Sequence, residues 1–287
     1  MDLALLLIQT LNAVQYGLLL FLVASGLTLI FGVMGVINLA HGSFYMMGAY
    51  LAFSLAAFTG NLLLTIVIGV VLSAVLGALL EWALFSHLYR RNHLQQVLLT
   101  YGLILIFEEL RSVLVGDEVY SVKVPAWLDF SVPLGSVMTY PAYRLFMSGV
   151  CLLVALGLYL LIQRTLVGAR IRAGSSNRDM VQILGINIDW LYRLVFALGV
   201  ALAAFAGMIN APASTVSPGM GTQVLIVSFV VVIVGGIGSV WGALLASLLV
   251  AFADTFSKVF VPDYAGIAIY VVMAAILLWR PEGLFKS

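Results

Sequence analysis

Long apolar runs constrain this chain more than any other feature of its sequence. A helix needs about 20 consecutive apolar residues to span a membrane, and one run near this length follows another. They lie at about 3–31, 62–85, 97–115, 143–162, 191–209 and 264–279. Of the 287 residues, 63% are hydrophobic and only 9% are charged, whereas soluble domains average about 25% charged. The sequence therefore predicts an all-α polytopic membrane protein.

Two glycine-rich segments interrupt the apolar sequence. They are GVMGVINLAHGSFYMMGAY at 32–50 and GGIGSVWG at 235–242, and each leads into a run rich in small residues. Broken helices of this kind, present twice, build the midplane site of many transporters. The chain crosses the membrane nine times, with its N-terminus outside, if residues 224–256 cross twice. Other crossings of 224–256 or of 1–58 give eight or ten. We expect about 8–10 transmembrane helices with broken or re-entrant segments, in a single domain over residues 1–287.

The polar and glycine residues of the two breaks are candidates for lining a solute path. Asn38, His41 and Ser43 are costly to bury in lipid without partners, and broken backbone must face protein or a water-filled cavity. The alternative is glycine-mediated helix packing, with a capped kink at Asn38 and a structurally satisfied His41. The candidates for the translocation path are Asn38, His41, Gly42, Ser43, Gly235, Gly236, Gly238 and Ser239.

Residues 164–193 are charged where the rest of the chain is apolar. They contain five arginines, and Ser175-Ser176-Asn177 precedes DMVQILG as a set of helix N-caps. Gly185 supplies a stop, so we expect a short helix at about 177–184, outside the bilayer. Its apolar residues are Met180, Val181, Ile183 and Leu184. Such a helix is either a binding site for a soluble partner protein or an interfacial helix that lies on lipid headgroups.

Positive charge predicts the sidedness of the chain. Nine of the thirteen Lys and Arg residues lie in three segments, namely Arg90–Arg91, residues 164–193, and the tail with Arg280 and Lys286. Because short cytoplasmic loops are rich in Lys and Arg, we expect residues 164–193 to form a cytoplasmic loop and residues 116–140 to be extracytoplasmic. The alternation in VYSVKV, followed by Pro125 and Pro133, predicts short strands or hairpin pieces in the latter segment.

The remaining charged residues do not suggest an enzyme. Glu108 and Arg111 are three apart and can pair on one helix face, with an ion relay as the alternative, and Glu81 is expected to reach toward the cytoplasmic interface. The acids form no chain across the membrane, which argues against a proton-driven mechanism. The sequence contains no Walker A, HExxH or GxSxG motif, and Cys151 is its only cysteine. We therefore expect no catalytic residue, metal site or cofactor in this chain.

Three motifs carry a resemblance to a known family. The segment at 32–50 resembles INxAHGxxYMxGAY, GARIRAGSSNRDMVQILGIN at 168–187 is similar to GRxxRAxxxxxxxAxxLGIN, and VVIVGGIGSVWGALLASLLV at 231–250 is similar to AxVLGGIGSxxGAxxGG. The tail WRPEGLFK also fits. These motifs belong to branched-chain amino acid ABC transporter permeases of the LivH type. Ser43 stands where some relatives have an acid, and Trp241 where proline or other residues occur, which leaves the substrate open.

The resemblance implies a permease subunit of a binding-protein-dependent ABC importer in a bacterial-type inner membrane. It would form half of the path for branched-chain or related amino acids. Its partners would be a LivM-like permease, two LivG/LivF-like ATP-binding subunits that hold ATP and Mg, and a periplasmic solute-binding protein. The coupling helix and its flanks would comprise Arg172, Asn177, Asp179, Met180, Ile183, Leu184 and Gly185. The alternatives are a stand-alone secondary transporter or channel for a small polar solute such as urea or an amide, and a membrane scaffold without a path.

Overall fold

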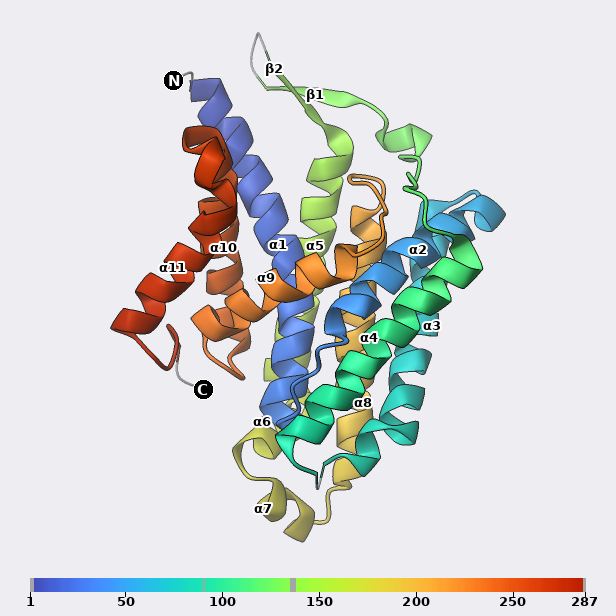
Figure 1. The fold of residues 1–287 in the computed structure, drawn as a ribbon, viewed down its shortest axis with the longest axis vertical. Coiled ribbons are helices and arrows are strands. Elements are labelled where there is room, and N and C mark those ends of the chain that lie inside the picture. Colours follow the sequence, from blue (N-terminus) through green and yellow to red (C-terminus); the bar gives the residue numbers. More distant parts are fainter. Residues whose placement is uncertain (1–2, 90, 135–137, 286–287) are drawn as a thin grey trace.

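The computed structural model describes residues 3–89, 91–134 and 138–285 (Figure 1). The side chains of Leu3, Leu134, Arg178 and Asp179 lie outside this description. The described residues form these helices: α1 (Leu3–Met34), α2 (His41–Thr59), α3 (Leu62–Ala83), α4 (His93–Val115), α5 (Ala142–Arg164), α6 (Leu166–Ser176), α7 (Arg178–Ile183), α8 (Ile188–Asn210), α9 (Met220–Gly235), α10 (Val240–Phe260) and α11 (Ala265–Trp279). A two-stranded antiparallel hairpin joins β1 (Ser131–Leu134) to β2 (Met138–Pro141).

The predicted all-α membrane architecture is confirmed. By length and composition, six helices of the described chain can cross a membrane: α1, α3, α5, α8, α10 and α11, some of them extended by a flanking turn. The helices α2 and α4 have 19 and 23 residues and are not among these six, and α9 is a shorter apolar helix of 16 residues. Each predicted break separates two helices, because α1 ends before α2 begins and α9 ends before α10 begins.

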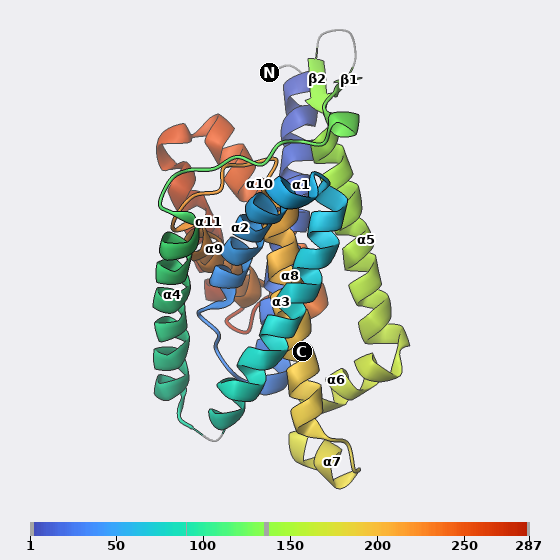
Figure 2. The same ribbon diagram turned by 90° about the vertical axis from the view of Figure 1, so that its right-hand side faces the viewer.

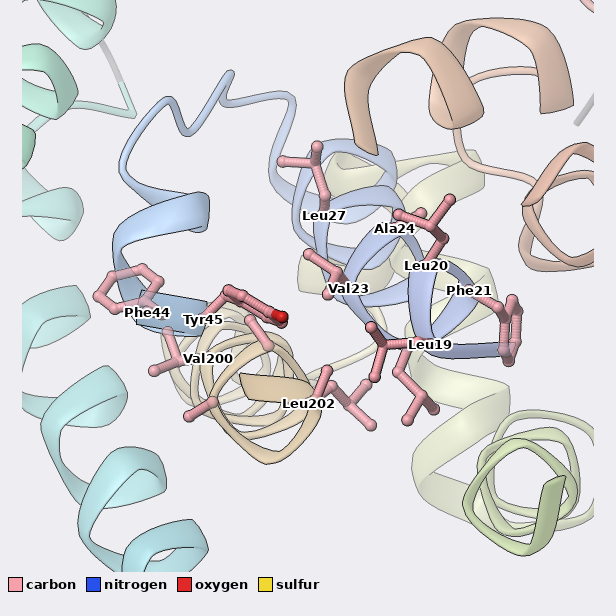
Figure 3. Packing of buried hydrophobic residues seen from close by; sticks show 14 of the residues in the cluster. Leu19, Leu20, Phe21, Val23, Ala24, Leu27, Phe44, Tyr45, Val200 and Leu202 are labelled. Carbon is pink, nitrogen blue, oxygen red and sulfur yellow. The ribbon is translucent and has the colours of Figure 1, made fainter. Parts of the chain in front are cut away.

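Helices α1 and α8 form the centre of the bundle. In their apolar windows 89% and 72% of the residues are buried, against 28% for α5 and 11% for the window containing α11. Figure 3 shows Val23 of α1 beside Tyr45 of α2, with Val200 of α8 close to Tyr45. The outer helices present many exposed leucines and valines, which suits a surface that meets lipid or another membrane subunit.

Small residues allow the inner helices to approach closely. A Cβ added to Gly26 of α1 would lie 2.7 Å from the carbonyl oxygen of Gly199 in α8, and one on Gly48 of α2 would lie 2.6 Å from Cα of Ala204 in α8. Lipid chains are as apolar as leucine, so close backbone packing is what holds such helices together. Gly48, which belongs to the first glycine-rich segment, therefore packs closely against α8.

The two ends of the bundle carry different structures. The N-terminus and the β1–β2 hairpin lie at one end, here called the hairpin end, and α7 lies at the other, here called the α7 end (Figures 1 and 2). The connection between α3 and α4 is also at the α7 end (Figure 2). Two of the three basic segments thus share one end of the molecule, as their charge predicts.

In the segment 116–140, regular strands begin closer to its C-terminal end than the sequence pattern indicates. The residues of VYSVKV form only an isolated bridge, in which Tyr120 and Val216 exchange backbone hydrogen bonds of 2.8 and 2.9 Å. Regular pairing begins at Ser131. An alternating pattern describes a strand only where a partner strand is available, and among the described residues the partner at Tyr120 is the connection between α8 and α9.

Candidate functional site

The first break returns the chain into the bundle. After α1 the backbone leaves the helix at Gly35, whose φ of +66° suits glycine, and α2 begins at His41. The Nε2 atom of His41 lies 3.0 Å from the carbonyl oxygen of Val23 in α1. At 1.5 Å per residue, Val23 is about 16 Å from the end of α1. Helix α2 therefore begins beside the middle of α1 and not at its end.

Polar atoms at the first break are only partly satisfied. The Asn38 side-chain oxygen accepts a hydrogen bond of 3.1 Å from the backbone N–H of Ala40, which caps the turn into α2. Asn38, His41 and Ser43 are all buried. Among the described residues, Asn38 Nδ2 and His41 Nδ1 have no hydrogen-bond partner. A buried unpaired polar atom costs about 1–3 kcal/mol, so these two atoms mark a position where a polar group from elsewhere would be favoured.

Gly42 joins the first break to α9. A Cβ at this position would lie 2.7 Å from Cβ of Leu225 and still closer to the Gly221 backbone. The start of α2 therefore rests directly on the first half of α9. In this conformation the predicted path residues of the first break face other helices of the same chain.

The second break depends on two glycines with positive φ. Gly236 has φ +96° and Gly238 has φ +85°, a region that other residues rarely adopt. Ser239 then starts α10, because its Oγ accepts a hydrogen bond of 3.0 Å from the N–H of Gly242. The tail completes the end of α9, since the N–H of Phe285 donates to the carbonyl of Gly235 at 3.2 Å. The backbone groups of this break are thus satisfied by local caps and by the C-terminal tail.

The structure brings the end of α1 against the second break. A Cβ on Gly32 would lie 2.9 Å from Cα of Gly238. Helix α9 connects the two breaks, since its first turn contacts Gly42 and its last residue opens the second break. Of the two sets of predicted path residues, one surrounds the start of α2, and the other lies beside the last turn of α1.

The short helix predicted at 177–184 is present as α7. Asn177 is its N-cap, with its side-chain oxygen accepting a hydrogen bond of 3.0 Å from the N–H of Met180, and Gly185 follows with φ +78°. Met180, Ile183 and Leu184 are 53%, 79% and 70% exposed. These three side chains form an exposed apolar patch at the α7 end. Asp179 belongs to α7, but its side chain lies outside the described residues.

Helix α6, which precedes α7, was not predicted. Thr165 caps it by accepting a hydrogen bond of 3.1 Å from the N–H of Gly168. Its two glycines and two arginines obscure the apolar periodicity in the sequence. The helix is held instead by contacts with its neighbours. Arg172 donates to the carbonyl of Ile162 in α5, and a Cβ on Gly174 would lie 3.0 Å from Leu191 of α8.

A small cavity lies where α6 meets the end of α1. Its volume is about 50 Å³, and its lining includes Thr28 and Gly32 of α1, Arg172 and Ser175 of α6, and Gly238 of the second break. The buried hydroxyl of Thr28 has no hydrogen-bond partner among the described residues. Here a predicted coupling residue, Arg172, and a predicted path residue, Gly238, line the same space. Nothing in the sequence pattern links these two positions.

The expectation that Glu81 reaches the interface is wrong. Its side chain is 1% exposed, and its Oε2 accepts a hydrogen bond of 3.2 Å from Nε of Arg193, which is 40% exposed. The Tyr89 hydroxyl donates to the other carboxylate oxygen. Burial, followed by the hydrogen bond to Glu81, raises the pKa of Tyr89 above its usual value. The acid stays inside because α8 supplies an arginine that is distant in sequence, so it does not need to reach water.

The predicted pair at the end of α4 is confirmed. Arg111 Nε lies 3.3 Å from Glu108 Oε2, and Arg111 Nη2 lies 2.9 Å from Asp117 Oδ1. Hydrogen bonds from Ser112 and then from Arg111 hold the pKa of Asp117 below its ordinary value. This cluster lies at the hairpin end and stabilises the turn after α4.

Comparison with known proteins gives a consistent result. A family model described as "Branched-chain amino acid transport system / permease component" matches residues 9–277. The chain is 30% identical to the high-affinity branched-chain amino acid transport system permease protein BraD of Pseudomonas aeruginosa, over 96% of this chain and 94% of BraD. It is 28% identical to LivH of Escherichia coli K12, with the same coverage. It is also 28% identical to the probable LivH permease of Methanocaldococcus jannaschii, over 95% of this chain and 90% of that protein. No solved structure matches the chain significantly.

Proposed function

Because the chain belongs to the family of permease components of branched-chain amino acid transport systems, we propose that it imports branched-chain or closely related amino acids as half of a translocation path. It is a multi-pass membrane protein and a transport subunit. Family membership supports an ABC importer over a stand-alone secondary transporter or channel. The named relatives supply the substrate class, and the structure supplies the elements that would move.

The partners follow from this proposal. A LivM-like permease would complete the path, two LivG/LivF-like subunits would bind ATP and Mg, and a periplasmic binding protein would deliver the solute. The chain itself would hold no ATPase site and would lie in the inner membrane as one permease domain over residues 1–287. The α7 end would face the cytoplasm with the loop 164–193, and the segment 116–140 would face outside. The shared position of two basic segments supports this orientation.

The exposed apolar patch of α7 is the proposed contact with an ATP-binding subunit. Three large apolar side chains on so short a helix form a surface that a partner protein would cover. The proposed coupling residues are Arg172, Asn177, Asp179, Met180, Ile183, Leu184 and Gly185. In this role Asn177 and Gly185 shape the helix, and Arg172 attaches the preceding α6 to α5.

The observation that carries the proposal is the cavity shared by α6, the end of α1 and the second break. A movement of α7 passes to α6, which contacts α1 near Gly32, and Gly32 touches Gly238. ATP-driven closure of the partner subunits would therefore act on the second break by a short series of contacts. Such rigid-body shifts of packed helices are a common means of switching between two states.

The two breaks form the proposed lining of the path: Asn38, His41, Gly42, Ser43, Gly235, Gly236, Gly238 and Ser239. Opening of the contact between Gly42 and Gly221 would expose the first set, whose unpaired Asn38 Nδ2 and His41 Nδ1 atoms can then meet a polar solute. Weak binding is sufficient here, because the binding protein provides the affinity.

The test uses the complete complex with its native partners in proteoliposomes. Leu184→Asp places a charge in the α7 patch, and we expect loss of ATP-driven uptake together with loss of the ATP-binding subunits on purification. Leu166→Asp is the matched control, because Leu166 is 80% exposed on α6 but outside the patch. It should retain uptake. Normal uptake by Leu184→Asp would refute the coupling role of α7, and solute flux without ATP in the wild type would favour a stand-alone transporter.

A further inference from the structure

An apolar groove opens on the outer surface between α1, α5 and α10. Its volume is about 330 Å³, and its lining includes Phe21, Leu156, Tyr159, Gln163, Trp241 and Leu244. Leu156 and Trp241 are each 51% exposed. The groove is therefore open to its surroundings along one side, unlike the closed contacts around α8. In a membrane, this face meets lipid or another subunit.

The groove runs along α5 toward the α7 end. Its lining on α5 extends from Leu152 to Gln163, which is about 16 Å at the rise of an α-helix. Near the end of the groove that lies toward the α7 end, Tyr159 and Trp241 pack edge to face, with ring centroids 5.1 Å apart. Tyrosine and tryptophan favour the membrane–water boundary, where their polar atoms reach water or headgroups. The groove thus begins in the apolar interior and ends at an interfacial aromatic pair.

A cationic region continues from this end of the groove. Ile162 and Val240 line both the groove and the small cavity that contains Arg172 and Ser175. The hydrogen bond from Arg172 to the carbonyl of Ile162 holds the guanidinium next to the groove. Arg172 is exposed, as are its sequence neighbours Arg164 and Arg170, and no carboxylate in the described part of the chain pairs with any of the three.

We propose that this groove is a binding site for an anionic phospholipid. One acyl chain lies along α5 between Phe21 and Leu244, and the headgroup phosphate accepts a hydrogen bond from the guanidinium of Arg172. Basic pockets between membrane helices are suited to such headgroups, and charge-assisted hydrogen bonds from arginine to phosphate are strong. A helix of a second permease would fill the apolar groove but would leave the arginines without counter-charges.

Helix α6 supports this assignment. Its buried side contains Ile171 and Gly174, while Arg170 and Arg172 are exposed, which is the arrangement of a helix that lies at a membrane surface. The lipid would contact α5, α6 and α10 together, next to the cavity that joins α6 to the second break. The proposal does not depend on which solute is transported or on the role of α7.

Fluorescence quenching by brominated lipids tests the proposal in the full-length chain. The protein is placed in nanodiscs of phosphatidylcholine that contain a small fraction of phosphatidylglycerol or phosphatidylcholine brominated near the headgroup end of one acyl chain. The contribution of Trp241 is the difference between wild type and Trp241→Phe. We expect brominated phosphatidylglycerol to quench this contribution about threefold more than brominated phosphatidylcholine at equal fraction.

Two controls separate a specific site from general lipid contact. Trp82 is exposed near the end of α3, at the same end of the bundle, and the contribution removed by Trp82→Phe should be quenched equally by both lipids. Arg172→Gln should abolish the preference at Trp241, whereas Arg280→Gln, which changes an exposed arginine on the tail, should keep it. Equal quenching of Trp241 by both lipids would refute the proposal. Quenching by neither would indicate that a second protein chain covers the groove.

Discussion

The two ends of the segment 164–193 are attached to the bundle in different ways. Its exit into α8 is held by a buried carboxylate, with Arg193 and Tyr89 both bonded to Glu81. Its entry through α6 is held by close glycine contacts, one arginine–carbonyl hydrogen bond and the edge of a 50 Å³ cavity. Charged groups buried in protein keep their geometry because a displaced charge is costly. A cavity bordered by glycine leaves room for a shift.

This difference gives the entry and the exit of segment 164–193 different roles. We infer that the exit joins α3, the α3–α4 connection and α8 into one rigid unit, while the entry transmits movement to the end of α1 and the second break. Coupling needs both properties, because α6 can pass a movement to α1 only if the other end of the segment stays fixed. Substitutions at the exit and at the entry test this difference, and a third at the hairpin end gives a reference for a weak, exposed interaction.

The largest effect is expected from removal of the buried acid. Glu81→Ala leaves Arg193 without its counter-charge and the buried Tyr89 hydroxyl without its acceptor. Because Arg193 is 40% exposed and keeps access to water, the cost is below that of a fully buried pair, about 2 kcal/mol. Glu108→Ala is the matched control, because Arg111 keeps a second counter-charge in Asp117, 2.9 Å away. The control should cost about 0.5 kcal/mol, since no charge is left without a partner. Thermal unfolding in detergent measures both, and equal losses would remove the distinction between a rigid exit and an ordinary ion pair.

An intermediate effect is expected from crowding of the entry. Gly32→Ala places a methyl group 2.9 Å from Cα of Gly238, so one backbone must shift. Overpacking of this kind costs about 1–3 kcal/mol, and ATP-driven uptake should fall about tenfold while the ATP-binding subunits remain bound.

Gly102→Ala provides the control for the entry, because nothing lies within 4 Å of a Cβ at that position in α4. Alanine favours a helix over glycine, so this variant should keep uptake and gain slight stability. If both glycine variants transport like wild type, the contact between α1 and the second break does not carry the coupling.

The smallest effect is expected at Asp117, the exposed member of the ion-pair cluster at the hairpin end. The folded-state pKa of Asp117 lies below its ordinary value, so its contribution to stability is present above that ordinary value and is lost as the pH falls through the lowered one. Asp117→Asn should therefore lower the unfolding temperature slightly at neutral pH and make no difference at strongly acidic pH. If Asp117→Asn lowered the unfolding temperature more than Glu81→Ala, the cluster at the hairpin end would be the more stabilising of the two.

Local signals in the sequence predicted much of the architecture correctly. Apolar runs of membrane-spanning length identified the long helices, and glycine-rich interruptions located both breaks. Asn177 and Gly185 marked the boundaries of α7 because capping and positive φ depend on neighbouring residues alone. Helix α6 escaped prediction because it is stabilised by α5, α1 and α8, and its own periodicity is weak.

The sequence by itself determined the class of protein, its breaks and the short helix on the charged loop, because hydrophobicity, caps and glycine act over a few residues. Only the tertiary structure decided which distant residues meet. It buried Glu81 against Arg193, started α2 beside the middle of α1, and set Gly32 against Gly238. These contacts depend on the directions in which whole helices pack, and close approach between helices arises from the shapes of both partners together.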